Sequence, residues 1–185
     1  MQPTCPSEIE HVINNLNSKK AIPLDHVPIK FIKISSSIIF IYLSDIFNNW
    51  IPSGVYPDIL KTAQITPIHK TGSCEKCSNY RPISLLPPIN KVFEKLLYDR
   101  LYSYLEHNKL LTDCQYGFRR GLSTELAIND LQNFLTQNID KGVVTCSIFL
   151  DLAKACDTVN HDILFHKLDI QYGIKGLPLT LLKTI

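Results

Sequence analysis

The stretch VVTCSIFLDLAKACDTV, from Val143 to Val159, decides how the rest of this chain is interpreted. Apolar and β-branched residues dominate Val143–Leu150, and the run ends at Asp151. Such a run predicts a buried strand that carries a carboxylate at its C-terminal end. A buried carboxylate needs a cationic partner, because an unpaired buried charge is costly. The pattern alone also allows Asp151 to be the first solvated residue after the strand, or the cap of a short helix.

The residues around Asp151 resemble the first palm motif of reverse transcriptases from non-LTR retrotransposons, F-x-D-x-x-K-A-F-D-x-V-x-H. The matching residues are Phe149, Asp151, Lys154, Ala155, Asp157, Val159 and His161. The resemblance implies that Asp151 is catalytic and binds two Mg²⁺ ions together with a later pair of aspartates, while the backbone carbonyl of Leu152 contacts one ion. Mg²⁺ takes oxygen ligands and bridges phosphates, which one carboxylate cannot achieve alone. Cys156 replaces the Phe that packs under the nucleotide sugar, so discrimination against a 2′-hydroxyl is expected to weaken.

A hairpin is predicted from two short β-prone runs, Ala63–Lys70 and Tyr80–Leu86, joined by a polar connection. Lys70 and Arg81 lie near its closed end, where they could bind a triphosphate or simply keep an edge hairpin soluble. The segment Pro67–Leu86 resembles the fingers signature of the same family, P-I-x-K-x-G followed by N-Y-R-P-I-S-L-L. The resemblance implies that Arg81, together with Lys70, contacts the phosphates of the incoming nucleotide.

A third match to the family is the phrase Q-x-G-F-R-x-G-x-S-T. It is present as Gln115, Gly117, Phe118, Arg119, Gly121, Ser123 and Thr124. An aromatic ring beside guanidinium groups on a glycine-containing loop suits the stacking of a base and the binding of a phosphate. The family places this loop near the template strand, which implies template-binding roles for Gln115, Phe118, Arg119 and Arg120.

Helical periodicity of apolar residues predicts most of the remaining elements. A short helix from Ser7 would begin with a capping box formed by Ser7 and Glu10. The other expected helices cover 28–50, ended by Pro52 and Gly54; 88–111; 123 or 124 to about 141; and about 161–172. In the fourth of these, the residues expected to face inward are Ala127, Leu131, Phe134 and Leu135.

Composition excludes several classes of protein. With 45% hydrophobic and 19% charged residues, the chain is composed like a globular protein. Residues 61–120 carry ten Lys/Arg against five Asp/Glu, a net +5, which indicates either a polyanion-binding region or a solvated surface.

Cys74 and Cys77 could be half of a zinc site or two loop thiols. No apolar run is long enough to span a bilayer, and no signal pattern is present, so an intracellular location in cytoplasm or nucleus is expected.

These observations predict an α+β fold, a partial and truncated right-hand polymerase consisting of the fingers and the start of the palm. The expected regions are a helical segment over 1–60, a fingers-like region over 61–142 and the incomplete palm over 143–185, whose strand would lack sheet partners and form an aggregation-prone edge. No Tyr-x-Asp-Asp phrase and no Asp-Asp pair occur in the sequence.

Three hypotheses on function follow. The first is a fragment of an RNA-directed DNA polymerase of a mobile element, inactive as this chain but part of a two-metal nucleotidyl transferase in the complete enzyme. Its partners would be an RNA template, a DNA primer and a dNTP, its cofactor Mg²⁺, with no membrane and no small-molecule cofactor. The second is a relic without catalysis that still binds RNA or DNA. The third is a structural product with no affinity for nucleic acid.

Overall fold

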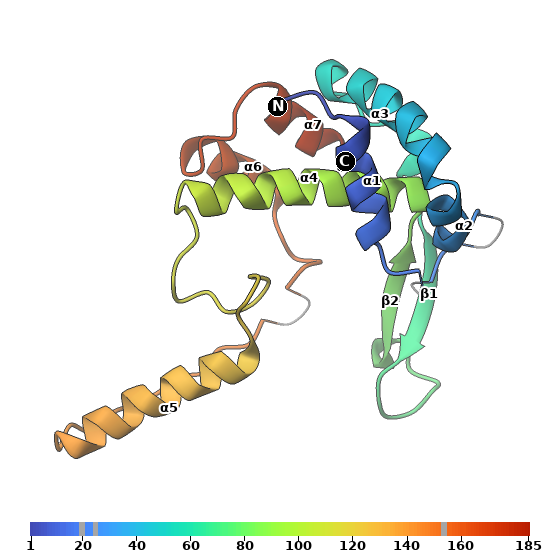
Figure 1. Ribbon diagram of the computed structural model, residues 1–185. Coiled ribbons are helices and arrows are strands. Elements are labelled where there is room, and N and C mark those ends of the chain that lie inside the picture. The colour runs from blue at the N-terminus through green and yellow to red at the C-terminus, as the bar shows by residue number, and fades with distance from the viewer. Residues whose placement is uncertain (19–20, 24–25, 153–154) are drawn as a thin grey trace. The chain divides into compact units, whose positions relative to one another are not determined.

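The computed structural model describes residues 1–18, 21–23, 26–152 and 155–185 (Figure 1). In these ranges the chain forms seven α-helices, two short 3-10 turns and one two-stranded sheet. This combination of helices and a small sheet confirms the mixed helix and sheet content. Lys154 of the palm motif lies outside the described residues. The chain divides into two compact units, Met1–Ser103 with Phe165–Ile185, and Tyr104–Leu164.

The first helix of the first unit is α1 (Pro6–Asn15), and its start corrects the prediction. Cys5 is the N-cap residue and makes no side-chain cap hydrogen bond, so the predicted capping box of Ser7 and Glu10 is wrong. Proline at the first helical position is favoured because its missing N–H would have had no partner there. Ser7 therefore falls inside the first turn, where its hydroxyl lies 3.1 Å from the Cys5 thiol.

The helix predicted over 28–50 forms as two helices, α2 (Ile29–Ile34) and α3 (Ser36–Ser53). The break falls at Ser35, the first of three consecutive serines, a residue type that competes with helical hydrogen bonding. The predicted end of the helix at Gly54 is confirmed, and this glycine adopts a left-handed conformation with φ of 64°, but Pro52, which was also expected to end the helix, lies inside α3. A side chain at this position would be strained, because L-residues rarely adopt positive φ.

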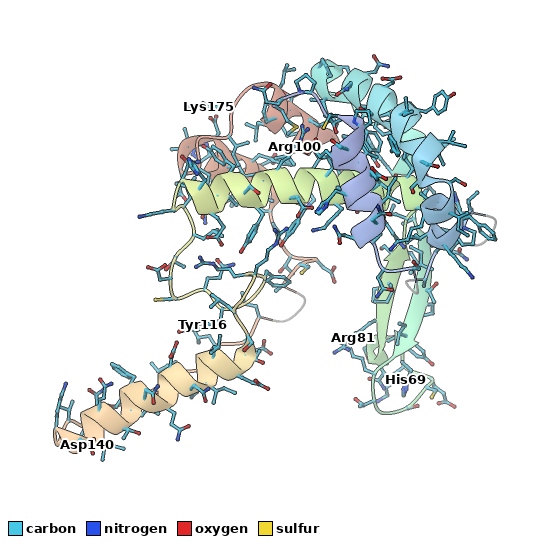
Figure 2. All side chains as sticks on the ribbon, in the orientation of Figure 1. His69, Arg81, Arg100, Tyr116, Asp140 and Lys175 are labelled. Carbon is cyan, nitrogen blue, oxygen red and sulfur yellow. The ribbon has the colours of Figure 1, made fainter. Side chains whose placement is uncertain are left out.

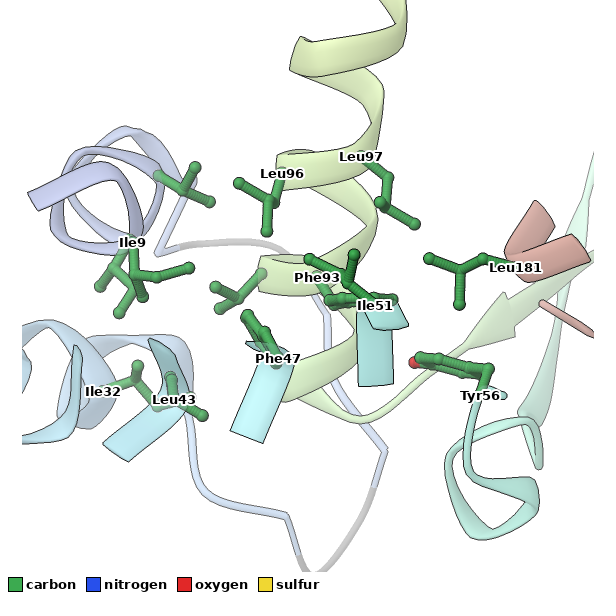
Figure 3. Packing of buried hydrophobic residues seen from close by; sticks show 13 residues of the cluster. Ile9, Ile32, Leu43, Phe47, Ile51, Tyr56, Phe93, Leu96, Leu97 and Leu181 are labelled. Atoms are coloured by element: carbon green, nitrogen blue, oxygen red, sulfur yellow. The ribbon is translucent and has the colours of Figure 1, made fainter. Parts of the chain in front are cut away.

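The hydrophobic core of the first unit lies between α1, α3, α4 (Pro88–His107) and α7 (Leu177–Thr184) (Figure 3). The apolar stripe predicted for α4 is confirmed at its centre. The fully or almost fully buried residues of the cluster are Ile9, Val12, Ile13, Ile32, Leu43, Phe47, Ile51, Tyr56, Val92, Phe93, Leu96, Leu97 and Leu181. Phe93 is the centre of an aromatic group, with ring centroids 4.8 Å from Phe47 and 5.4 Å from Tyr56. Burial of the Tyr56 hydroxyl raises the pKa of that side chain.

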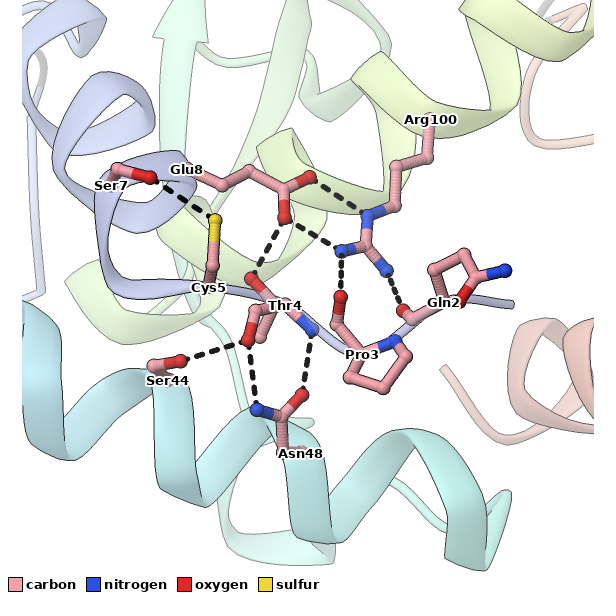
Figure 4. Close-up of polar contacts among 9 residues, drawn as sticks. All are labelled: Gln2, Pro3, Thr4, Cys5, Ser7, Glu8, Ser44, Asn48 and Arg100. Atoms are coloured by element: carbon pink, nitrogen blue, oxygen red, sulfur yellow. Dashed lines mark hydrogen bonds and ion pairs between the residues drawn. The ribbon is translucent and has the colours of Figure 1, made fainter.

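A polar cluster fastens the N-terminal residues to the helices (Figure 4). The guanidinium of Arg100 on α4 donates to both carboxylate oxygens of Glu8, at 2.9 and 2.6 Å, and to the carbonyl of Gln2 at 2.5 Å. Asn48 on α3 exchanges two hydrogen bonds with the backbone of Thr4, at 2.7 and 2.8 Å. The hydrogen bond from Arg100 holds the pKa of the Glu8 carboxyl below its usual range. These contacts tie α1, α3 and α4 together through side chains.

The predicted hairpin is confirmed as β1 (Gln64–His69) paired antiparallel with β2 (Tyr80–Leu85). The turn η1 (Asp58–Leu60) precedes the hairpin, and η2 (Cys77–Asn79) lies in its connection. Both strands are largely exposed, with the consequence that the hairpin presents its side chains to solvent.

In the second unit, α5 (Thr124–Asp140) has the predicted boundaries. Ser123 is its N-cap, and its hydroxyl accepts a hydrogen bond from the backbone N–H of Leu126 at 3.2 Å. The predicted inward face is wrong, because no residue of α5 is buried by the described parts of the chain. The helix α6 (His161–Ile170), which begins in the second unit and ends in the first, is two residues shorter than predicted, and Gly173 follows it with φ of 67°.

The buried strand predicted over 143–150 is also wrong. These residues have no regular secondary structure, and Ile148 and Leu150 are 81% and 89% exposed. A strand exists only where a neighbour accepts and donates its ladder hydrogen bonds. Among the described residues the only sheet is the β1–β2 hairpin, and it offers no pairing to this segment.

Candidate functional site

The hairpin places the two predicted phosphate-binding cations, Lys70 and Arg81, on one face. In the register of the sheet Ile68 lies opposite Arg81, and the N–H of Lys70 donates to the carbonyl of Asn79 at 2.8 Å. Residues two apart along a strand face the same side, so Lys70 and Arg81 are diagonal neighbours. Both residues are exposed, and Figure 2 shows Arg81 near the closed end of the hairpin. Two exposed cations on one face can bind an anion between them.

The connection of the hairpin is held by its own contacts. The Tyr80 hydroxyl donates to the carbonyl of Cys74 at 2.9 Å, and the ring of His69 packs edge-on against Tyr80 with 5.2 Å between centroids. The Cys74 thiol lies 3.8 Å from Nε2 of His69. Nevertheless, within the described ranges no three metal-binding side chains gather, so the zinc hypothesis for Cys74 and Cys77 has no ligand set.

The loop after α4 holds the four predicted template-binding residues. The side chain of Arg119 is 15% exposed, and its guanidinium donates to both oxygens of Glu106, at 3.2 and 3.1 Å. Phe118, by contrast, is 94% exposed and has a positive φ of 62°. The Gln115 amide donates to the carbonyl of Gly117 at 3.1 Å. Arg120 is exposed. The structure therefore brings these residues together on one loop but gives them different environments.

Asp151, Leu152 and Cys156 lie close in sequence and are all exposed. Asp151 follows the irregular segment 143–150, and residues 155–158 form a turn in which the Thr158 hydroxyl donates to the carbonyl of Ala155 at 3.3 Å. The prediction that Asp151 ends a buried strand is wrong in both respects, because the strand does not form and the carboxylate is exposed. Its predicted role in metal binding stays a prediction.

Comparison with known proteins decides the family. Residues 68–171 match the family described as reverse transcriptase (RNA-dependent DNA polymerase). This chain belongs to that family. The matched range contains the hairpin from Ile68 onward, the loop with Phe118 and Arg119, and Asp151. The resemblance to reverse transcriptases of non-LTR retrotransposons is therefore confirmed.

Several relatives of this chain come from mobile elements of flies. The probable RNA-directed DNA polymerase from transposon BS of Drosophila melanogaster is 33% identical over 168 residues, which cover 90% of this chain and 18% of that protein. The RNA-directed DNA polymerase from mobile element jockey of Drosophila melanogaster is 32% identical over 161 residues, 86% of this chain and 18% of the relative. The jockey polymerase of Drosophila funebris is 31% identical, with 89% and 18% covered. The chain thus spans about one fifth of the length of these relatives.

Reverse transcriptases generally use divalent metal ions, and Asp151 is the residue of this chain that the family phrase assigns to such an ion. Asp151 would supply one carboxylate, and Leu152 one backbone carbonyl. No group of three or more metal-binding side chains occurs in the part of the chain that the structure describes. A hard octahedral cation such as Mg²⁺ needs more oxygen ligands than these two residues supply. The described residues therefore do not form a metal site by themselves.

One contact of the predicted template-binding loop could not be predicted from the sequence, the pairing of Glu106 with Arg119. The helical periodicity of residues 88–111 indicates which side chains face the core, but it does not identify partners across a loop. The two residues are 13 positions apart, outside any helical spacing. A weak signal existed, because an isolated acidic residue in the last turn of a helix is unfavourable unless a cation is close.

None of the helices in the described ranges combines the length and the apolar character needed to cross a membrane.

Proposed function

We propose that this chain supplies the nucleotide-binding fingers, part of the template path and the first catalytic carboxylate of an RNA-directed DNA polymerase from a non-LTR mobile element. The observation that carries the proposal is the family match over residues 68–171, which includes both Arg81 and Asp151. The relatives named as RNA-directed DNA polymerases align over most of this chain and support the same role.

Arg81 and Lys70 are proposed to bind the triphosphate of an incoming dNTP. Their placement on one exposed face supports this role, because a guanidinium can contact a phosphate through two N–H groups while an ammonium acts as a point charge. Cys156 would occupy the position under the sugar. A thiol there fills less volume than the phenyl ring of the family phrase, so exclusion of a ribonucleotide would be weaker.

Asp151 and the carbonyl of Leu152 are proposed to bind Mg²⁺ in the complete enzyme. The ion would neutralise charge on the phosphates of the nucleotide. These 185 residues hold no Asp-Asp pair, and one carboxylate is too few for two ions. We therefore expect no polymerase activity from these residues alone.

The loop of Gln115, Phe118, Arg119 and Arg120 is proposed to contact the RNA template, opposite a DNA primer. An exposed aromatic ring and an exposed cation on the same loop are suited to a single strand, since the ring can stack on a base of any identity. The alternative, a relic that binds RNA without catalysis, shares this loop. It differs only in the absence of nucleotidyl transfer.

The test is primer extension by a chimera in which this segment replaces the aligned part of the jockey polymerase. Arg81→Gln is expected to raise the KM for dNTP by at least about tenfold, since a charged hydrogen bond to phosphate is worth roughly 1.5–3 kcal/mol. The matched control, Lys76→Gln in the same hairpin connection, should leave KM unchanged. An Arg81→Gln chimera with an unaltered KM would refute the assignment of the hairpin, and an inactive parent chimera would favour the relic.

A further inference from the structure

The backbone conformation and the exposure of Phe118 are both unfavourable. Its φ of 62° lies in the left-handed region, which bulky residues other than glycine rarely adopt. Its side chain is 94% exposed, so the ring gains nothing from burial in this unit. An unfavourable conformation persists only where surrounding contacts impose it, and such residues concentrate at binding sites. The contacts on both sides of Phe118 are therefore informative.

On the C-terminal side, Arg119 is held by three hydrogen-bonding contacts. Two go to the carboxylate of Glu106, in the last turn of α4, and the third goes from Nη1 to the carbonyl of Thr112 at 2.8 Å. Two parallel bonds between a guanidinium and a carboxylate fix both position and orientation. Arg119 thereby closes the loop onto the end of α4, and its charge is matched within the unit.

On the N-terminal side, Gln115 and Tyr116 hold the loop. The Gln115 amide bonds to the carbonyl of Gly117, and the Tyr116 hydroxyl donates to the carboxylate of Asp130 on α5. Figure 2 shows Tyr116 beside the first turns of α5. That hydrogen bond raises the pKa of the Tyr116 hydroxyl. The loop is thus anchored to α4 on one side of Phe118 and to α5 on the other, and the ring projects from between the anchors.

We propose that Arg119 is a positioning residue: paired with Glu106, it fixes the loop so that Phe118 stacks on an unpaired base of single-stranded RNA. Arg120, which is exposed, supplies the phosphate contact of this loop. The inference rests on the proposed function, because it assumes that the loop meets the template. Three adjacent residues of the loop then have three different roles, which the sequence pattern alone does not distinguish.

The test is binding of a fluorescein-labelled oligo(U) strand to the full chain at several NaCl concentrations. Glu106→Gln and Arg119→Gln are each expected to weaken binding about tenfold, the effect of one lost stacking contact, with the double variant no weaker than either. The slope of log Kd against log salt should stay unchanged in both, because no phosphate contact is lost. Glu125→Gln, which removes a negative charge elsewhere in the same unit, is the control and should bind like the parent or slightly tighter.

Two further variants separate stacking from charge. Phe118→Ala should lose about tenfold in affinity without a change in salt slope, and Phe118→Trp should retain it. Arg120→Gln should reduce the slope by about one. A direct readout of the pairing is limited trypsin digestion, in which Glu106→Gln should accelerate cleavage after Arg119 and Arg120 while the core fragment stays resistant.

The opposite pattern would overturn the inference. If Arg119 bound a phosphate, Arg119→Gln would reduce the salt slope by about one, and Glu106→Gln would tighten binding by releasing the guanidinium. Unchanged trypsin cleavage in Glu106→Gln would likewise contradict the positioning role. Absence of RNA binding by the parent chain would count against the proposed template contact as a whole. If the parent chain binds RNA but the variants show this opposite pattern, only the positioning role of Arg119 would be contradicted.

Discussion

The two units of this chain differ in how far their apolar side chains are buried. The first unit packs helices from both ends of the sequence around Phe93, and the side chains of Phe47, Tyr56 and Phe93 are almost fully buried. In the second unit, no apolar residue in the described ranges is buried, although 143–150 is among the most apolar runs of the sequence. The difference shows that an apolar run orders only where a complementary surface exists. A helix carries its own backbone hydrogen bonds, whereas a strand depends on neighbours.

The largest effect on the free energy of unfolding is expected for a substitution in the core of the first unit, compared with one in the second unit. Phe93→Ala should lower the free energy of unfolding by about 3–5 kcal/mol, because it removes the ring at the centre of the core. Phe149→Ala, which removes an 80% exposed ring of the second unit, should change it by less than about 0.5 kcal/mol. Urea unfolding followed by the fluorescence of Trp50, the single tryptophan, measures both, since that ring packs 5.4 Å from Phe93. Equal effects would show that the contrast in burial does not exist in solution.

A smaller effect is expected at the polar cluster of the first unit. Arg100→Gln should cost about 2 kcal/mol, because the Glu8 carboxylate loses its charged hydrogen bonds. Arg81→Gln, on the exposed hairpin, is the control and should be neutral within about 0.5 kcal/mol.

The same pair predicts a dependence on pH. Since the folded-state pKa of Glu8 is lowered by Arg100, its contribution is complete above the ordinary pKa of a glutamate and is lost as pH falls through the lowered value. Urea midpoints between pH 7 and pH 3 should converge for the parent and Glu8→Gln. If the difference between the two urea midpoints stayed constant over this pH range, the ion pair of Glu8 with Arg100 would not be its source.

A substitution in residues 143–150 is expected to have the smallest effect on stability and a clear effect on self-association. Ile148→Lys places a charge on an exposed, unpaired run and should leave unfolding unchanged while it reduces self-association. Sedimentation velocity over a range of concentrations measures this, with Ile128→Lys on the exposed part of α5 as the matched variant. If both variants reduce association equally, general surface charge rather than the unpaired segment is responsible.

The sequence predicted best what depends on local interactions. The hairpin and a helix start at residue 123 or 124 could be predicted because turn residues and capping residues act on their immediate neighbours. The start of α1 at Pro6 differs by one residue from the prediction, and the break at Ser35 was not predicted; several local signals compete at both places. The position of α7 in the core was not predicted, because its contact with α3 joins segments more than 120 residues apart.

The candidate site shows the same limit. Motif resemblance identified Arg81, Phe118 and Asp151, and the family match covers all three. It could not distinguish the partly buried pairing of Arg119 from the exposure of Phe118, since both follow from the fold of one loop. It also assigned Asp151 to a strand that needs partners which the described residues do not provide.

The most direct test of the account is the role of Asp151 in catalysis. Asp151→Asn should reduce primer extension by the jockey chimera at least about a thousandfold, because a neutral amide cannot replace a carboxylate ligand of a catalytic ion. The control, Asp140→Asn at the exposed end of α5, should retain parental activity. Extension at the parental rate by the Asp151→Asn chimera would contradict the assignment of this chain to the catalytic part of a reverse transcriptase.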